Sequence, residues 1–430
     1  MHLFTKNILI LHPKQRITII YSHEMKNINI YTLTSELHDA QSVNQATEAF
    51  LNSLHVNFDL KGDDYSDYGT AALSVIFVRT GGTEGIFRQL LPQLQSASHD
   101  SKFYLLTSGK SNSLAASLEI LSFLRQQGLQ GEVIHGTTEH ITHRLQILEQ
   151  VELARKKLNG CRIGVIGRPS DWLISSTADY TAIKQKVGID IIDIPMEELL
   201  NEIHQTPLQK DTTESLKTPC EKQIADALPG AEQIYHALKT LIDKHQLRGL
   251  TIRCFDLLTT VHNTGCIALA QLNAEGIVSG CEGDIPTLLT MMLTNAITGV
   301  SGFQANPAHI NPENGETLFA HCTIPLNMLE HYELDTHFES GIGVAIRGYM
   351  KPGPVTLFKV SGNLQRHFLA EGQLLRCEGK PDLCRTQEVI LLNDASQARY
   401  FLTDPIGNHH VVVPGHVKEV MDELLNTINS

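Results

Sequence analysis

The strongest constraint on the fold of this chain is the alternation of short apolar runs with helix-period segments from residue 72 to residue 298. Leu73–Arg79 has the composition of a buried strand, and a helical segment follows it through Leu94. The order repeats with a strand over Phe103–Leu106 and a helix over Ser113–Gln127, whose apolar residues recur at helical spacing. This alternation predicts a parallel sheet, because a parallel crossover needs a connection of helical length.

A second α/β unit follows a long predicted helix over Thr138–Leu158, which Asn159 and Gly160 close. The further elements predicted for this unit are strands over Arg162–Ile166, Ile189–Ile194 and Gly249–Cys254, and a helix over Ile285–Thr298 that Gly299 ends. The polar stretch Gln205–Thr218 predicts an exposed loop or insertion. Near the N-terminus, Ile8–Leu11 and Ile17–Tyr21 resemble a β-hairpin.

The pattern changes after about residue 309, where short alternating runs are separated by turn residues. These runs are Gly343–Tyr349, Val355–Val360, Leu374–Arg376, Val389–Leu392, Tyr400–Leu402 and Val411–Val413. Such runs are typical of a β-rich domain, and Val417–Thr427 predicts a closing amphipathic helix. We therefore predict an α/β protein with two Rossmann-like parallel-sheet domains (residues 1–157 and 158–308) and a β-rich C-terminal domain (residues 309–430).

The composition is that of an ordinary globular chain and excludes several classes of partner. The 430 residues carry 34 basic and 47 acidic side chains, a net charge of −13, and no basic block stands out. This argues against binding to nucleic acid or to an anionic membrane surface. We expect neither a signal peptide nor a membrane span. The eight cysteines form no CxxC pair, which favours reduced thiols in a cytoplasmic protein.

Polar residues gather at the ends of predicted elements between Gly280 and Pro325. Glu282 and Asp284 directly precede the helix that begins at about Ile285, Asn306 lies in Phe-Gln-Ala-Asn-Pro, and His321 ends a strand-like run. A second group near the C-terminus contains His409, followed seven residues later by His416. Oxygen and imidazole ligands without paired cysteines suit Mn²⁺, Mg²⁺, Co²⁺ or Fe²⁺ better than a structural zinc ion.

These motifs resemble the L-fucose isomerase family. The shared features are a Glu-x-Asp at a helix start (Glu282, Asp284), a Phe-x-x-acid pattern that ends 24 residues later at position 306, and an Asn-His-x₆-His over Asn408–His416. The added histidine, His321, is similar to the pattern of L-arabinose isomerases. The resemblance implies a metal-dependent aldose–ketose isomerase with a bound Mn²⁺ and a small-molecule sugar substrate. It also implies a homo-oligomer, a trimer or hexamer, whose sites a neighbouring subunit completes.

The resemblance assigns roles to individual residues. The implied metal residues are Glu282, Asn306, His321 and His409, and the implied catalytic residues are Glu282 as ligand and base and Asp284 as a second acid or base. This chain departs from the family at Asn306, where the family has a carboxylate ligand. An amide can offer a carbonyl oxygen to a metal, but it carries no charge and cannot act as a base. We therefore expect weaker metal binding, with altered or absent isomerase chemistry.

Several of these residues have a second interpretation. Asp284 is also explained as an N-cap, with Pro286 in the first helical turn. His321 fits a ligand, a substrate contact or an ordinary buried histidine. His409 and His410 point to opposite faces of a strand, so at most one reaches a given metal, and His410 is expected to be a supporting or buried residue.

The remaining candidates are substrate contacts. Trp172, the only tryptophan, lies in a strand-to-helix loop of the kind that binds ligands, although tryptophan is also common in cores. His416 is a cap-region residue or a substrate contact. Glu339 and Arg385 are polar residues in apolar surroundings that face the site or pair with each other. The loops Thr80–Thr83 and Ser108–Ser111 could cradle an anion, but ordinary turns explain them better.

The sequence thus favours a metal-dependent sugar isomerase that works through a cis-enediol. Two alternatives from other classes stay open. One is a sugar-binding or regulatory protein without isomerase activity, which Asn306 favours. The other is a different metal-assisted reaction on a sugar acid.

Overall fold

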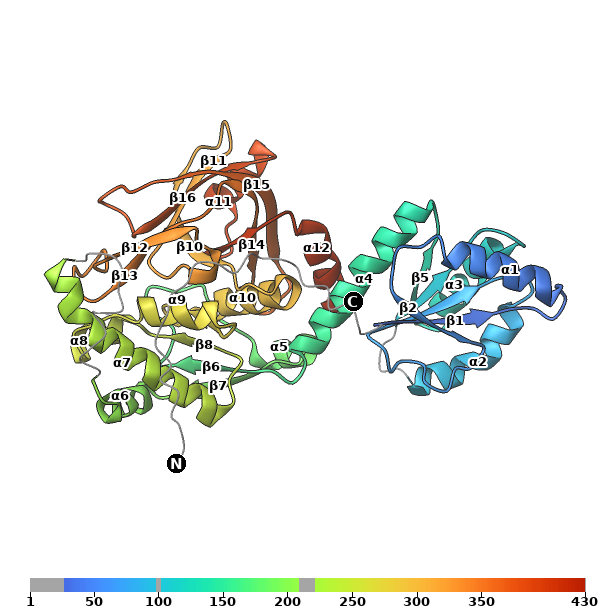
Figure 1. Cartoon of the computed structure of the whole chain (residues 1–430), viewed down its shortest axis with the longest axis horizontal. Coiled ribbons are helices and arrows are strands. Elements are labelled where there is room, and N and C mark those ends of the chain that lie inside the picture. Colours follow the sequence, from blue (N-terminus) through green and yellow to red (C-terminus); the bar gives the residue numbers. More distant parts are fainter. Residues whose placement is uncertain (1–26, 98–101, 209–220, 430) are drawn as a thin grey trace, which may run out of the picture. The chain divides into compact units, whose positions relative to one another are not determined.

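The computed structural model describes residues 27–97, 102–208 and 221–429. The chain forms two compact units and passes from the first to the second at Lys156–Lys157 (Figure 1). The predicted hairpin near the N-terminus and most of the predicted loop over Gln205–Thr218 lie outside the described residues. Among the described residues, no helix has both the length and the apolar character needed to cross a membrane.

The first unit contains a parallel sheet with the strand order β2-β1-β3-β4-β5. Its strands are β1 (Ile28–Leu33), β2 (Phe58–Gly62), β3 (Leu73–Val78), β4 (Lys102–Leu106) and β5 (Gln130–Ile134). Its helices are α1 (Ala40–Leu51), α2 (Glu84–Ala97), α3 (Ser113–Gln126) and α4 (Thr138–Leu158). Ile76 and Val78 of β3 share a core with α2 and α3, whereas Val75 and Phe77 share one with α1 and α4. Both faces of the sheet are covered, which explains why β3 is apolar along almost its whole length.

The second unit begins with a four-stranded parallel sheet in the order β7-β6-β8-β9. The strands are β6 (Arg162–Ile166), β7 (Asp190–Ile194), β8 (Gly249–Ile252) and β9 (Val278–Gly280). The helices are α5 (Tyr180–Val187), α6 (Met196–Gln205), α7 (Lys222–His245), α8 (Phe255–Thr260), α9 (Cys266–Ala274) and α10 (Ile285–Thr298). Gly299 adopts a φ of 80° and ends α10, as expected for a helix C-cap.

The rest of the second unit is a closed β-barrel with the strand order β10-β11-β16-β15-β14-β17. Its strands are β10 (Phe303–Ile310), β11 (Glu316–His321), β14 (Gly353–Val360), β15 (His367–Cys377), β16 (Thr386–Leu392) and β17 (His410–Pro414). A two-stranded sheet of β12 (His331–Asp335) and β13 (Ala345–Tyr349) and the helices α11 (Tyr400–Thr403) and α12 (Lys418–Ile428) accompany it.

Helix α10 joins the parallel sheet to the barrel. It follows β9 in the chain and packs against β14 and β17. The backbone N–H of Val360 in β14 donates to Thr290 Oγ1 of α10 at 3.1 Å. The carboxyl end of β9 therefore lies next to one end of the barrel, where residues from both parts can meet.

The predicted fold class is confirmed: the protein has parallel α/β sheets followed by a β-rich part that includes a barrel. The predicted strand over Tyr400–Leu402 is wrong, because these residues form α11. The rings of Tyr400 and Phe401 pack on Phe368, at centroid distances of 3.8 and 5.1 Å. Tyr400 and Phe401 both pack on the same ring, whereas adjacent residues of a strand would point to opposite faces of the sheet.

Candidate metal centre

The carboxylate of Glu282 is held by a tight turn between β9 and α10. Glu282 and Gly283 both adopt left-handed backbone conformations, with φ of 65° and 70°. A Cβ at Gly283 would lie 2.6 Å from the carbonyl oxygen of Arg168, so this position requires glycine. Glu282 does carry a Cβ, and its conformation costs about 1–3 kcal/mol. Strain of this kind collects at functional sites, where the surrounding structure enforces it.

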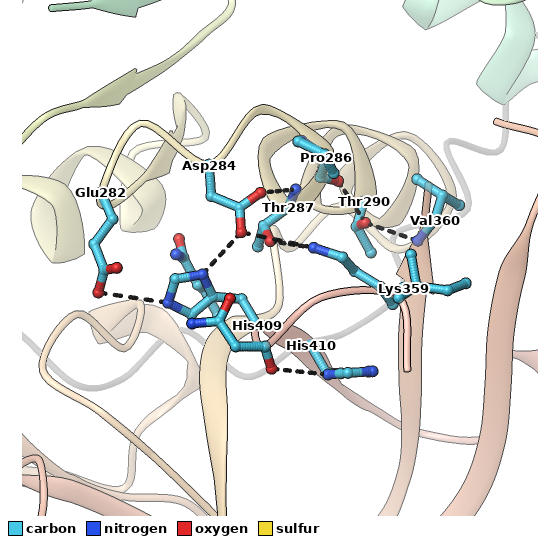
Figure 2. A network of polar contacts seen from close by, with 12 residues as sticks. Glu282, Asp284, Pro286, Thr287, Thr290, Lys359, Val360, His409 and His410 are labelled. Carbon is cyan, nitrogen blue, oxygen red and sulfur yellow. Dashed lines mark hydrogen bonds and ion pairs between the residues drawn. The ribbon is translucent and has the colours of Figure 1, made fainter. Parts of the chain in front are cut away.

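Two histidines from the barrel face this carboxylate. His321 ends β11, and His409 directly precedes β17. Glu282 Oε1 lies 3.6 Å from His321 Nε2 and 3.5 Å from His409 Nε2, and Figure 2 shows the contact with His409. One ligand atom from each of the three buried residues lies within 4.8 Å of the other two. The fold thus brings together three of the predicted site residues.

Both histidines are oriented through Nδ1. His409 Nδ1 lies 2.8 Å from Asp284 Oδ2, and His321 Nδ1 lies 2.9 Å from Thr323 Oγ1. These contacts leave Nε2 of each ring directed to the common point near Glu282. His409 Nε2 is buried and has no hydrogen-bond partner among the described residues. A buried polar nitrogen without a hydrogen bond is rare in folded proteins, and this one, 3.5 Å from Glu282 Oε1, is placed to bind a metal ion.

Asp284 is fully buried and contacts three neighbouring residues. Its Oδ1 accepts a hydrogen bond from the backbone N–H of Thr287 at 2.8 Å, so it is the N-cap of α10. Its Oδ2 faces His409 and lies 3.7 Å from Lys359 Nζ. Lys359 is 1% exposed and donates to Thr287 Oγ1 at 2.6 Å (Figure 2). Asp284 therefore positions His409, and a buried ammonium group compensates its charge.

The electrostatics favour a cation near Glu282. Burial alone would raise the pKa of Glu282, but the imidazoles of His409 and His321 lower it. Burial also opposes ionisation of Asp284, yet Lys359 and His409 hold its pKa well below the usual range. Burial alone would lower the pKa of His409, but the two carboxylates raise it to about 9. Both carboxylates are therefore ionised at neutral pH, and a metal ion would displace a proton from His409.

The three donors fit a divalent metal ion. Ligand atoms that share one ion at about 2.0–2.6 Å lie within roughly 5 Å of one another, as these do. A carboxylate that fixes Nδ1 of a ligating histidine, as Asp284 does for His409, is the common arrangement around metal sites. Three protein ligands leave coordination positions open for substrate oxygens.

An aromatic side chain borders the centre. Trp172 Nε1 donates to Glu282 Oε2 at 2.7 Å, and its ring meets Phe255 edge-on at a centroid distance of 4.7 Å. Trp172 nevertheless stays 50% exposed. A half-exposed indole beside a carboxylate offers an apolar surface of the kind that packs on the C–H face of a sugar.

Asn306 and His416 occupy different places relative to His409. Asn306 lies on β10, and its Oδ1 accepts a hydrogen bond from Asn408 Nδ2 at 3.0 Å, next to His409 in the chain. His416 lies beyond the other end of β17, with Nδ1 3.4 Å from Glu371 Oε2. Five strand residues span roughly 15 Å, so the structure does not bring His416 to the centre.

Glu339 and Arg385 do not pair with each other in the described structure. Arg385 donates to the carbonyl oxygen of Thr336 at 2.8 Å and lies 3.4 Å from Asp335. Partial desolvation raises the pKa of Glu339, and the charge of Glu282 adds to the shift. Glu339 is exposed and belongs to the surroundings of the centre, where His337 also packs on Phe255 at 5.5 Å between ring centroids.

Sequence reasoning missed Lys359, Thr323 and His337 as parts of the centre or its surroundings. The sequence does contain an indication for Lys359, because it is the one charged residue in the apolar run Val355–Val360. A lysine at a buried position of a strand needs a partner. Nothing comparable marks Thr323, whose role depends on the position of the His321 ring.

Comparison with known proteins points to sugar isomerases. No family model matches the chain. The sulfoquinovose isomerases of Priestia aryabhattai and Priestia megaterium are each 26% identical to it over 335 residues, which cover 74% of this chain and 74% of each relative. The sulfoquinovose isomerase of Alkalicoccus urumqiensis is 24% identical over 262 residues, or 58% of this chain and 59% of the relative. The chain is therefore similar to sugar isomerases over most of its length.

Proposed function

We propose that this protein is a divalent-metal-dependent aldose–ketose isomerase, with Mn²⁺ as the favoured ion. The observation that carries the proposal is the convergence of Glu282 Oε1 on Nε2 of His321 and of His409, at 3.6 and 3.5 Å. These three residues would hold the ion. A bound divalent ion polarises the carbonyl and hydroxyl oxygens of a sugar and stabilises the negative charge that develops on them.

The substrate we propose is a sulfonated aldose of the sulfoquinovose type. The support is the similarity to sulfoquinovose isomerases over 74% of the chain. Sulfoquinovose is an aldose with a sulfonate group, so its isomerisation needs the same proton transfer between carbons 2 and 1 as that of an unsubstituted sugar.

We assign each residue of the centre a separate role in this proton transfer. Glu282 takes the proton from carbon 2 of the open-chain aldose and returns it to carbon 1, while the hydroxyl proton of O2 ends on O1. A positioned base of this kind contributes about 10²–10⁴ in rate. The indole N–H of Trp172 holds Oε2 of Glu282, and Asp284 keeps the His409 ring in place. Trp172 also presents its exposed face to the sugar.

A sugar-binding protein without turnover is the second candidate, and Asn306 favours it. This neutral amide stands where the resembled family has a carboxylate, and its oxygen is engaged by Asn408. Such a protein would keep the centre and bind the sugar without changing it.

One experiment separates these functions. Purified protein would be analysed for bound metal and incubated in D₂O with sulfoquinovose, glucose, L-fucose and L-arabinose, with Mn²⁺ added. The proposal predicts a metal-dependent ketose product in which carbon 1 carries partly the hydrogen from carbon 2 and partly solvent deuterium, because the proton held by Glu282 can exchange before it is returned. Turnover should be lost in Glu282→Gln and retained in Glu313→Gln, an exposed control on the β10–β11 turn. Metal and sugar binding without any product would favour the binding protein. The absence of metal binding would refute the metal-dependent isomerase, and the absence of sugar binding would refute the binding protein.

We also propose that the protein is a homo-oligomer, as the isomerase resemblance implies. Light scattering at micromolar concentration would show a trimer or hexamer. A fully active monomer would contradict this.

A further inference from the structure

A charged pocket of about 280 Å³ lies at the carboxyl edge of the parallel sheet in the first unit. Its walls come from the segment after β1, the end of β3 and the loop after β4. The polar residues that matter below are His38, Asp39, Arg79, Ser108, Lys110 and Ser111. All of them belong to the first unit, whereas Glu282, His321 and His409 belong to the second.

The pocket coincides with the point where the strand order reverses. The chain goes from β1 outward to β2 and then returns to the other side of β1 with β3. In open α/β sheets, the crevice beyond the carboxyl ends of the strands at such a reversal is where ligands bind. The loops after β3 and β4 are fixed to each other here, because Gly81 N–H donates to the Ser111 carbonyl oxygen at 2.7 Å.

Arg79 is a half-buried cation whose polar contacts are all neutral. Its Nε donates to Thr34 Oγ1 at 2.6 Å, and its Nη1 donates to Asn44 Oδ1 at 2.9 Å and to Thr47 Oγ1 at 3.3 Å. Within the described part of the chain, Nη2 has no hydrogen-bond partner. Burial lowers the pKa of Arg79, because it disfavours the charge, and the nearby carboxylate of Asp63 offsets only part of that shift. An anion would offset that cost.

Two cationic side chains, Arg79 and Lys110, and one carboxylate, that of Asp39, line the pocket. Among the described residues, neither Arg79 nor Lys110 lies within ion-pair distance of an acidic side chain. The carboxylate of Asp39 is directed to the start of α1, where Oδ2 accepts a hydrogen bond from Ser42 N–H at 2.8 Å. The hydroxyl groups of Ser108 and Ser111 line the wall next to Lys110.

We propose that this pocket is a binding site for a tetrahedral oxyanion, phosphate or sulfonate, carried on a sugar-sized molecule. Arg79 and Lys110 bind the oxyanion, because paired cations and hydroxyl groups are the usual partners of such groups. The volume exceeds that of a bare oxyanion, and His38 and Asp39 provide hydrogen-bonding groups for hydroxyls of the attached sugar. The site takes its ligand independently of any turnover at Glu282.

Isothermal titration calorimetry on the full-length protein tests this assignment. The probes are inorganic phosphate, glucose 6-phosphate and glucose, because sulfoquinovose, the proposed substrate, would also bind at the candidate metal centre. We expect binding of the two phosphate probes and none of glucose at the same millimolar concentration. Arg79→Met and Lys110→Met should each weaken binding at least about tenfold, which is the loss of one charge-assisted contact. Arg88→Met, an exposed arginine of α2 outside the pocket, should bind as the wild type does.

The outcomes are distinct. Equal affinity for phosphate and glucose 6-phosphate would identify a free anion as the natural ligand, and tighter binding of glucose 6-phosphate would identify an anionic sugar. Failure of the wild type to bind any oxyanion, or unchanged binding in both Met variants, would overturn the proposal. Lys110 is exposed, so Lys110→Met keeps the test valid even if Arg79→Met unfolds. Glu282→Gln should retain phosphate binding, and its loss in that variant would assign the anion to the candidate metal centre instead.

Discussion

Replacement of Lys359 by methionine tests the buried charge network beneath the candidate metal centre. Lys359 Nζ lies 3.7 Å from Asp284 Oδ2, and both side chains are at most 1% exposed. Two unit charges at this distance interact by about 4 kcal/mol when the effective dielectric constant is near 20. Removing one partner of a buried pair typically costs about 3–5 kcal/mol, because the other charge stays buried without compensation. We expect Lys359→Met to lower the free energy of unfolding by about 3 kcal/mol.

A double-mutant cycle isolates this interaction. Asp284→Asn alone should also destabilise the protein, since it leaves the Lys359 ammonium buried and weakens the contact with His409. The double variant removes both charges, so its loss should be smaller than the sum of the two single losses by about 2–4 kcal/mol. Strict additivity would mean that the two charges do not interact.

The assay is urea unfolding followed by tryptophan fluorescence. Trp172 is the only tryptophan of the chain and contacts Glu282 directly, so its emission reports on the unit that carries the centre. Lys351→Met, at an exposed position before β14, is the control and should change stability by no more than about 0.5 kcal/mol. A loss below about 1 kcal/mol in Lys359→Met would refute the reasoning that Asp284 depends on this cation.

Three further changes test other parts of the molecule. Asn306→Asp adds a negative charge beside the His409 loop and should tighten Mn²⁺ binding by about tenfold or more in a fluorescence titration; unchanged affinity would place residue 306 outside the coordination sphere. Trp172→Phe removes the donor to Glu282 Oε2 and should lower kcat/KM about 10–100-fold with the fold intact by circular dichroism, since a hydrogen bond to a charged group contributes about 1.5–3 kcal/mol. Burial raises the pKa of Glu388 from 4.5 to about 8. As the pH rises from about 4.5 to about 8, ionisation of Glu388 therefore favours the unfolded state more and more, and the cost to the folded state reaches about 5 kcal/mol. Glu388→Gln should therefore gain stability relative to the wild type between about pH 5 and pH 8 in urea unfolding, and a constant difference would contradict the assignment.

Local pattern predicted much of the fold because periodicity, caps and turns are local properties. The helix over Ile285–Thr298 was predicted with the bounds that the structure has, since Asp284 supplies the N-cap and Gly299 the left-handed end. The predicted strand over Arg162–Ile166 has the same bounds as β6. Tyr400–Leu402 was predicted wrongly because its conformation depends on packing against Phe368, which is distant in sequence.

The residues of the candidate site could be predicted only where the family resemblance assigned them a role. Glu282, His321 and His409 meet because β9 and β11 end, and β17 begins, near one another. No local sequence pattern predicts that these three positions come together. The sequence spacing linked His416 to His409, but a strand of five residues carries it away from the centre. Lys359 reaches Asp284 from β14, so its role could be found only from the packing of α10 against the barrel.

Anomalous diffraction from crystals of the protein grown or soaked with Mn²⁺ tests the proposed metal centre most directly. We predict one strong peak within about 2.0–2.6 Å of Glu282 Oε1, His321 Nε2 and His409 Nε2. The peak should disappear in His409→Ala crystals treated in the same way. No peak at this position in wild-type crystals, or a peak that remains in the His409→Ala variant, would contradict the assignment of these three residues as a metal centre.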